Sequence, residues 1–479
     1  MIGDPSFALR VGPRFRLPAF PGEALPPRLA TATYYDTADH ALALAGVSLA
    51  RRVERRAAAW RLELPCGAGR VLLEVPGRRG DVPAAVRDLV TAYARGRELG
   101  PVATLRSRRA ALRVRGLDGP LADVVLETIA VLDARPGSRK VLRRLRRLEV
   151  EGVGGDEAAL DRIVQGLRAA GAEDGDGRPP VLQALDLPRP APPAPPDPGA
   201  PAAEHLGAMI QAQLAALLAH DPGARVGADP EALHHMRVAT RRLRAVLRAA
   251  RPMLATEWVE PLREELAWLG DLLGSVRDLD VLLARLRDDA AALEPPERRA
   301  ATRLLRRLAA ERAQARAALL DGLRSQRYLD LLGRLEEAGR APRVVAAVSL
   351  NAIAGSEFRK LRRAMRALGE APTDAELHAV RIRGRRARYA TELAEAAVGE
   401  AASRFIRRAQ VFQDVLGEHQ DASVAERRIR QLVASARARW AAFAAGRLVE
   451  RQRARREAAR AALPDTWAKL EKRGRAAWP

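Results

Sequence analysis

The chain has 479 residues and a formal net charge of +23, with 82 Lys or Arg against 59 Asp or Glu. Apolar residues make up 48% and charged residues 29%, which excludes a disordered polyelectrolyte and predicts two or three globular domains. The single cysteine, Cys66, excludes a disulfide framework or a cysteine-based zinc site within one chain and favours a reducing compartment.

Residues 1–173 are expected to form an α+β domain. Short β-like runs such as ATYYDT, AWRLELP and RVLLEVP alternate with turn signals, and VPAAVRDLVTAYARG and DEAALDRIVQGLRAAGA have helical periodicity. This pattern predicts an antiparallel sheet or barrel with attached helices. The beginning of the chain lacks the pattern of a secretory signal, and no run is apolar and long enough for a membrane span, so we expect a soluble, cytoplasmic protein.

A proline-rich segment separates this domain from the rest of the chain. Residues 174–203 are expected to act as a semi-rigid spacer, because proline supports neither a helix nor an inner strand. Almost every later window is rich in Ala, Leu, Arg and Glu with helical spacing, which predicts an all-α domain over residues 204–479.

The helical half contains an internal repeat. LHHMRVATRRLRAV is echoed by LHAVRIRGRRARYA at a separation of 144 positions, which matches His234, Arg237, Arg241, Arg242 and Arg244 with His378, Arg381, Arg385, Arg386 and Arg388. A second echo, LGSVRDLDV and LGEHQDASV, matches Asp278 with Asp421. We therefore expect two similar bundles, residues 204–345 and 346–479, related by a pseudo-twofold axis.

Helical spacing places the repeated cations in rows. The first row, at intervals of 3, 4, 3 and 4 positions, consists of His234, Arg237, Arg241, Arg244 and Arg248. One interpretation is a solvated face paired with acids of neighbouring helices. The other is a polyanion site, because cations one turn apart repel each other and guanidinium groups bind phosphate oxygens in pairs. The recurrence of histidine at the head of both rows favours the second interpretation.

These paired segments resemble the CHAD domain, the conserved histidine α-helical domain, from about residue 204 to the C-terminus. The resemblance implies two helical bundles around a basic groove that binds inorganic polyphosphate without a cofactor, and association with cytoplasmic polyphosphate granules. The candidate ligands are His234, Arg237, Arg241, Arg242, Arg244, Arg248, Arg359, Lys360, Arg363, His378, Arg381, Arg385, Arg386 and Arg388. His419 has no assigned role, and the Asp278/Asp421 pair is open between metal binding and the orientation of Arg or His side chains.

Residues 7–172, with the segment LATATYYDTADHALALAGVSLARRVERRAAAWRLELP, resemble the CYTH family of triphosphate tunnel metalloenzymes. The resemblance implies a β-barrel tunnel in which basic residues bind triphosphate and glutamates hold Mg or Mn ions that activate water. The candidate phosphate ligands are Arg51, Arg52, Arg106 and Arg108. Glu149 and Glu151 share one strand face with Arg147 and are the candidate metal ligands.

The sequence departs from this family at positions where active members carry metal and phosphate ligands. Asp4, Ser6 and Ala8 occupy the slots of the ExExK signature, and Glu63 stands where the family more often has Lys. Because Mg²⁺ needs several carboxylate oxygens, we assign no catalytic residue and expect a degenerate tunnel that binds phosphates or serves for docking. Mg or Mn is required only if the tunnel is active.

Two other functions remain open at this point. One is a metal-dependent triphosphatase or polyphosphate-end hydrolase, and the other is a non-specific nucleic-acid binder. Aromatic residues are only 4% of the chain and do not interleave with the basic helices, so stacking on bases and reading of bases lack side chains. We expect polyphosphate as the partner, without a specific nucleic acid or a membrane; the sequence favours no particular oligomeric state.

Overall fold

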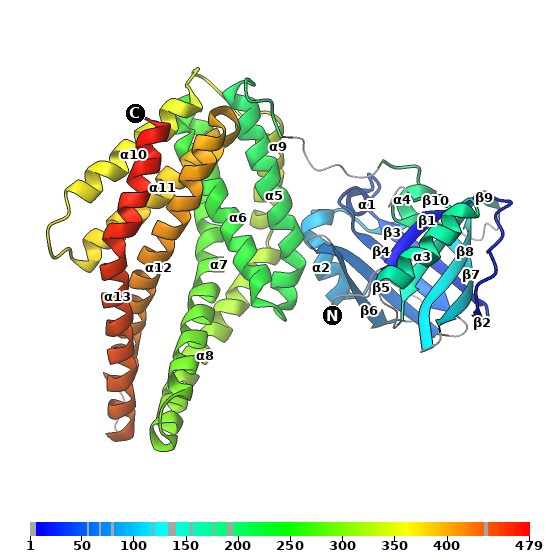
Figure 1. Cartoon of the computed structure of the whole chain (residues 1–479), viewed down its shortest axis with the longest axis horizontal. Coiled ribbons are helices and arrows are strands. Elements are labelled where there is room, and N and C mark those ends of the chain that lie inside the picture. Colours follow the sequence, from blue (N-terminus) through cyan, green and yellow to red (C-terminus); the bar gives the residue numbers. More distant parts are fainter. Residues whose placement is uncertain are drawn as a thin grey trace. The chain divides into compact units, whose positions relative to one another are not determined.

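The computed structural model describes residues 6–479 apart from 55–56, 67–68, 78–80, 117–118, 133–139, 154–156, 176–177, 189–194 and 435–438. The chain separates into two compact units, residues 1–191 and 192–479 (Figure 1). None of the helices in these ranges is long and apolar enough to cross a membrane.

The first unit is built on one antiparallel sheet. Its strand order is β10-β1-β9-β8-β7-β3-β4-β5-β6, with β2 paired to β7. The strands are β1 (Ser6–Arg10), β2 (Gly22–Ala24), β3 (Arg28–Asp36), β4 (Ser48–Glu54), β5 (Ala57–Cys66), β6 (Gly69–Pro76), β7 (Gly100–Gly116), β8 (Gly119–Leu132), β9 (Val141–Gly152) and β10 (Glu173–Asp174). The predicted antiparallel, tunnel-like α+β fold is confirmed. Within the described strands, the end strands β10 and β6 do not pair with each other, so the tunnel is open rather than a closed barrel.

Alternation along the strands gives the sheet an outer apolar face and an inner polar face. On β9, Leu148 and Val150 join a buried cluster with Leu160 and Leu167 of α3 (Glu157–Ala169), whereas Arg147 points to the inner side. Helix α3 thus covers one face of β8 and β9. The other helices of this unit are α1 (Ala41–Leu44), α2 (Ala84–Ala94) and α4 (Pro180–Ala184).

Helix α4 lies inside the segment that we expected to be a spacer. Its Pro180 is at the first helical position, where a missing N–H costs nothing and the fixed φ of proline favours the helix. The expectation that residues 174–203 hold no helix was therefore wrong for this stretch.

The second unit is all-helical, as predicted. It contains α5 (Ala202–Val226), α6 (Pro230–Ala249), η1 (Arg251–Met253), α7 (Thr256–Ala291), α8 (Pro295–Arg324), α9 (Gln326–Arg340), α10 (Leu350–Arg366), α11 (Asp374–Val398), α12 (Glu400–Ala434) and α13 (Arg439–Ala477). The repeat appears as matched helices: α5 to α8 correspond in order to α10 to α13, and α9 is an addition to the first copy.

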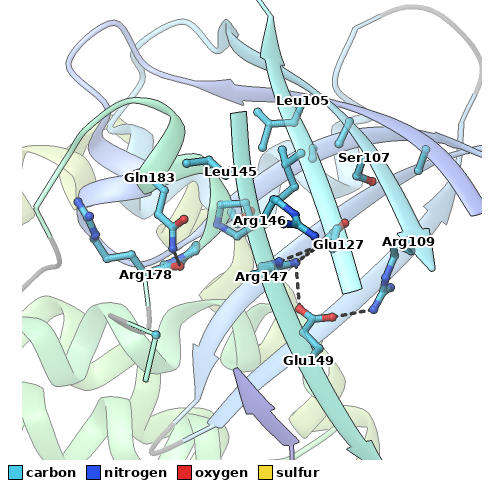
Figure 2. Close-up of a pocket in the computed structure, with 18 of the residues that line it drawn as sticks. Leu105, Ser107, Arg109, Glu127, Leu145, Arg146, Arg147, Glu149, Arg178 and Gln183 are labelled. Atoms are coloured by element: carbon cyan, nitrogen blue, oxygen red, sulfur yellow. Dashed lines mark hydrogen bonds and ion pairs between the residues drawn. The ribbon is translucent and has the colours of Figure 1, made fainter. Parts of the chain in front are cut away.

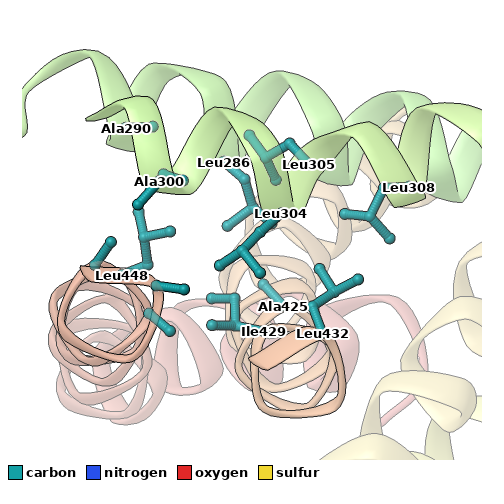
Figure 3. Close-up of a cluster of buried hydrophobic side chains, with 14 of the residues drawn as sticks. Leu286, Ala290, Ala300, Leu304, Leu305, Leu308, Ala425, Ile429, Leu432 and Leu448 are labelled. Atoms are coloured by element: carbon teal, nitrogen blue, oxygen red, sulfur yellow. The ribbon is translucent and has the colours of Figure 1, made fainter. Parts of the chain in front are cut away.

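An apolar cluster joins the two copies (Figure 3). Leu286 of α7 and Leu304 of α8 belong to the first copy, and Ile429 of α12 and Leu448 of α13 belong to the second. All four side chains are buried in the same cluster. The two long helical hairpins, α7–α8 and α12–α13, therefore share one core.

Candidate functional site

The repeated cations are carried by α6 and α11, which lie against each other in the second unit. Both helices begin at defined caps: the Asp229 side chain accepts from the Glu231 amide with Pro230 at the first helical position, and Thr373 and Glu376 form a capping box. The caps begin the two helices at equivalent points of the repeat.

Four guanidinium groups meet between these helices. Arg237 and Arg241 come from α6, and Arg381 and Arg385 come from α11. We call these four residues the central arginine cluster. All four are half-buried, and the Nε atom of Arg381 is buried without a hydrogen-bond partner. The two copies of the repeat thus contribute equivalent pairs of cations to one place.

The cluster is short of negative charge. Burial lowers the pKa of Arg385 to about 9, and the neighbouring Arg381 and Arg241 add to the effect. Burial also lowers the pKa of Arg381, which Asp421 opposes and Arg241 reinforces. Cations that are partly removed from water and face each other raise the free energy of the empty site. An anion bound here would relieve that cost.

The two aspartates of the second echo each interact with one arginine of the central arginine cluster. Asp278 of α7 forms an ion pair with Arg237 at 2.9 Å. Asp421 of α12 faces Arg381, and burial raises the pKa of Asp421. Among the residues described, no group of three or more His, Cys, Asp or Glu is arranged to hold a metal ion. The geometry supports the orientation of arginine over metal binding for this pair.

Sequence reasoning missed Tyr389. Arg241 Nε donates to the Tyr389 hydroxyl at 2.8 Å, and the Arg388 guanidinium lies 4.8 Å from the centre of its ring. Burial alone would raise the pKa of Tyr389, but Arg241 and Arg388 lower it below its ordinary value. The equivalent position in the first copy is Ala245, so the repeat itself gave no signal for this residue.

Two predicted ligands are held by internal partners. Arg388 is buried, donates to Gln410 and lies 3.5 Å from Glu392. Arg242 lies 3.3 Å from the other oxygen of Glu392. The prediction of Arg388 as a ligand is therefore corrected: its sequence spacing fits the row, but the side chain is packed inside the unit.

The other predicted cations lie further out. Arg244, Arg248, Arg359 and Arg363 are exposed, and Arg386 is half-buried. Lys360 is paired with Glu357 of its own helix at 2.5 Å.

The histidines differ between the copies. His234 is half-buried with its ring centre 5.5 Å from that of His235, and burial lowers its pKa. His378 is exposed, with Nδ1 2.9 Å from Gln420 Oε1. His419 is 2% exposed, and its Nε2 lies 3.3 Å from Asp374, a position typical of a structural histidine.

The first unit contains a cavity of about 670 Å³ inside the curved sheet (Figure 2). Inward residues of the strands line it, among them Arg52, Ser107, Arg109, Glu127, Arg147, Glu149 and Glu151. The prediction that Arg147, Glu149 and Glu151 share a face is confirmed.

Arginines of the cavity hold its carboxylates. Arg147 Nη2 lies 2.6 Å from Glu127 and 2.9 Å from Glu149, and these glutamates raise the pKa of Arg147 against the effect of burial. Arg109 Nη2 lies 2.6 Å from Glu149 and 3.4 Å from Glu151. The carboxylate oxygens that a tunnel metal would need are engaged by guanidinium groups, so these residues do not fit Mg or Mn.

Three predicted phosphate ligands of the tunnel lie on the wrong face. The inward residues of β7 are Leu105, Ser107 and Arg109, so Arg106 and Arg108 point outward and are exposed. On β4 the inward set includes Arg52, which places Arg51 on the opposite face.

The structure covers the ExExK slots only in part. Asp4 lies outside the described residues. Ser6 and Ala8 belong to β1, whose backbone pairs them with Glu151 and Glu149 of β9. The slots of Ser6 and Ala8 therefore lie beside the strand that carries Glu149 and Glu151.

We expect Mn²⁺ titrated into the full chain to show no binding tighter than ~10⁻³ M, because Glu127 and Glu149 are already neutralised by arginine. Electron paramagnetic resonance of free Mn²⁺ measures this directly, with phosphate release from triphosphate assayed in the same samples. Glu149→Gln/Glu151→Gln is the matched control and should behave like the wild type. Saturable Mn²⁺ binding that this variant loses would show that the carboxylates do serve a metal.

Comparison with known proteins assigns the second unit to a family. The family model of the CHAD domain matches residues 208–430. Uncharacterized protein Rv2226 of Mycobacterium tuberculosis is 30% identical over 478 residues, which cover 94% of this chain and 91% of the relative.

Solved structures are similar to this chain over part of its length. PptA from Streptomyces chartreusis is 27% identical, with a TM-score of 0.50, over 56% of this chain and 100% of its own. The CHAD domain from the plant Ricinus communis is 26% identical, with a TM-score of 0.48, over 59% of this chain and 96% of its own. HpAC1 from Hippeastrum, for which a dominant triphosphatase activity is described, is 15% identical, with a TM-score of 0.24, over 39% and 97%. This last likeness bears on no residue's role.

Proposed function

The chain belongs to the CHAD domain family, and from that premise we propose that its helical unit binds inorganic polyphosphate across the central arginine cluster. The observation that carries the proposal is the meeting of the half-buried Arg241, Arg381 and Arg385 with too few carboxylates. Burial, reinforced by repulsion from Arg381 and Arg241, lowers the pKa of Arg385 to about 9. A polyanion supplies the missing charge.

Polyphosphate suits this arrangement because it is linear and offers anionic oxygens at every unit. Each charge-assisted hydrogen bond from a guanidinium contributes about 1.5–3 kcal/mol before ordering costs. We propose that binding needs no cofactor and no membrane, and that the protein acts in the cytoplasm where polyphosphate granules form. Aromatic residues make up only 4% of the chain, so a specific nucleic-acid sequence is not proposed as a partner.

For the first unit we propose a non-catalytic role, in binding phosphates or in docking. The pairing of Arg147 and Arg109 with Glu127 and Glu149 supports this role, because it removes the ligands that hydrolysis through a metal requires. The cavity keeps more arginines than glutamates, which suits anions.

The test is titration calorimetry of long-chain polyphosphate into the full chain at ~0.15 M salt. We expect saturable binding that duplex DNA, added at equal phosphate concentration, does not displace. Absence of binding would refute the proposal. Equal displacement by DNA would show a non-specific polyanion binder, whose affinity follows total charge and salt alone.

A further inference from the structure

At one pair of equivalent positions, the repeat that builds the central arginine cluster reverses the charge of the side chain. Arg248 ends the cationic row of α6, and the position 144 residues later is Glu392 on α11. The two residues flank the cluster on opposite sides, because Glu392 contacts Arg242 of α6 whereas Arg248 faces Arg383 of α11. Two positions that the duplication would make alike thus carry opposite charges.

The Glu392 side carries less positive charge than the Arg248 side. Glu392 lies 3.3 Å from Arg242 and 3.5 Å from Arg388, and its side chain is 10% exposed. Both cations are the counterparts of residues that stay cationic on the other side, Arg386 and Arg244. One buried carboxylate therefore offsets one of the two cations with which a polyanion could continue on this side.

The Arg248 side is cationic. We call Arg248, Arg263, Arg383 and Arg386 the outer arginine cluster. Burial lowers the pKa of Arg386, and Arg248 and Arg383 reinforce this by repulsion. Burial and the neighbouring Arg263 do the same to Arg248. Arg383 has no cationic counterpart in the first copy, where Ala239 stands.

A hollow of about 460 Å³ opens beside the outer arginine cluster. Arg248 and Arg263 line it together with Arg251 and Lys360. Glu260 pairs with Arg263 and Arg251, and Glu357 pairs with Lys360. Glu357 also attracts Arg248 and Arg386, but among the described residues neither they nor Arg383 form an ion pair with a carboxylate. The surplus on this side is therefore positive.

We propose that the polyphosphate site is one-sided: a chain bound on the central arginine cluster continues over Arg248, Arg383 and Arg386, and Glu392 stops it on the other side. This inference rests on the proposed function and adds a direction to it. Long chains gain contacts that short ones cannot reach, so the outer arginine cluster sets the preference for chain length. Inorganic triphosphate engages the central cluster alone.

The test compares inorganic triphosphate with long-chain polyphosphate on three full-length proteins: wild type, Arg248→Gln/Arg386→Gln, and Glu392→Gln. We expect the double variant to lose about tenfold or more in affinity for the long chain and to bind triphosphate within about twofold of wild type. Glu392→Gln should bind the long chain severalfold more tightly, because the opposite side opens. Long-chain affinity unchanged in the double variant, or weakened in Glu392→Gln, would overturn the inference.

Arginine modification by phenylglyoxal, read by mass spectrometry on the wild type, makes the result independent of variant folding. We expect the long chain to protect Arg248 and Arg383 and triphosphate to leave both reactive. Equal reactivity with both ligands would also overturn the inference. Failure of the proposed function gives a different result, since the wild type would then bind neither ligand.

Discussion

Arg241→Gln/Arg385→Gln is expected to lower the affinity for long-chain polyphosphate by at least about 100-fold. Each lost guanidinium removes charge-assisted hydrogen bonds of about 1.5–3 kcal/mol, and 1.4 kcal/mol corresponds to a factor of ten. The two residues come from opposite copies of the repeat and face each other, so both would contact a ligand that binds between α6 and α11 as proposed. Titration calorimetry at constant salt measures the change.

Folding and total charge are controlled separately. Removal of two mutually repelling cations should not lower the thermal midpoint, although the Tyr389 hydroxyl loses the hydrogen bond that Arg241 donates to it. Arg106→Gln/Arg108→Gln removes the same charge from the outer face of β7 and should leave the affinity within about threefold, the effect of net charge alone. A similar loss in both variants would mean that binding follows net charge and not the cluster.

Arg225→Ala is expected to destabilise the helical unit by about 3–5 kcal/mol, because it leaves a buried carboxylate without its cation. Arg225 Nε donates to Asp221 at 2.6 Å, and the side chains are 1% and 0% exposed. Tyr328 of α9 donates to the same aspartate at 2.9 Å, and Arg225 also donates to the Leu323 carbonyl at 2.7 Å. The network ties α5 to α8 and α9.

Denaturant unfolding followed by circular dichroism measures this loss. Arg340→Ala is the matched control, because its ion pair with Glu336 also spans four positions on one helix but is exposed on the arginine side. That variant should change the free energy of unfolding by less than about 1 kcal/mol. A loss as small for Arg225→Ala would show that Asp221 is accommodated without its cation.

The helical half was predictable because its internal duplication is visible within one sequence, without comparison with relatives. The constant separation from Arg237 to Arg381 and from Arg241 to Arg385 fixed their equivalence, and helical periodicity placed them on a common row. The neighbours of each row were not predictable. Arg388 fits the spacing, but it lies close to Glu392, one turn later on the same helix. Glu392 also pairs with Arg242 of α6.

The tunnel shows a different limit. Alternation in a strand tells which residues share a face, so Arg106 was correctly grouped with Arg108, but it does not tell which face is inside. That choice depends on how β7 pairs with β3 and β8, where Arg109 lies opposite Glu127 and Arg28. A shift of one position exchanges the entire inner and outer sets. Charge offered no guide, because both faces of β7 carry arginine.

The apolar cluster shared by α7, α8, α12 and α13 has a thermodynamic consequence. Leu286 and Leu304 come from one copy of the repeat, and Ile429 and Leu448 come from the other, so each copy covers the other's leucines. A chain severed between the copies would expose this face in both fragments, and self-pairing of one fragment would be the way to cover it again. The two halves thus depend on each other as the subunits of an obligate dimer do. Because they belong to one polypeptide, they stay paired at any dilution.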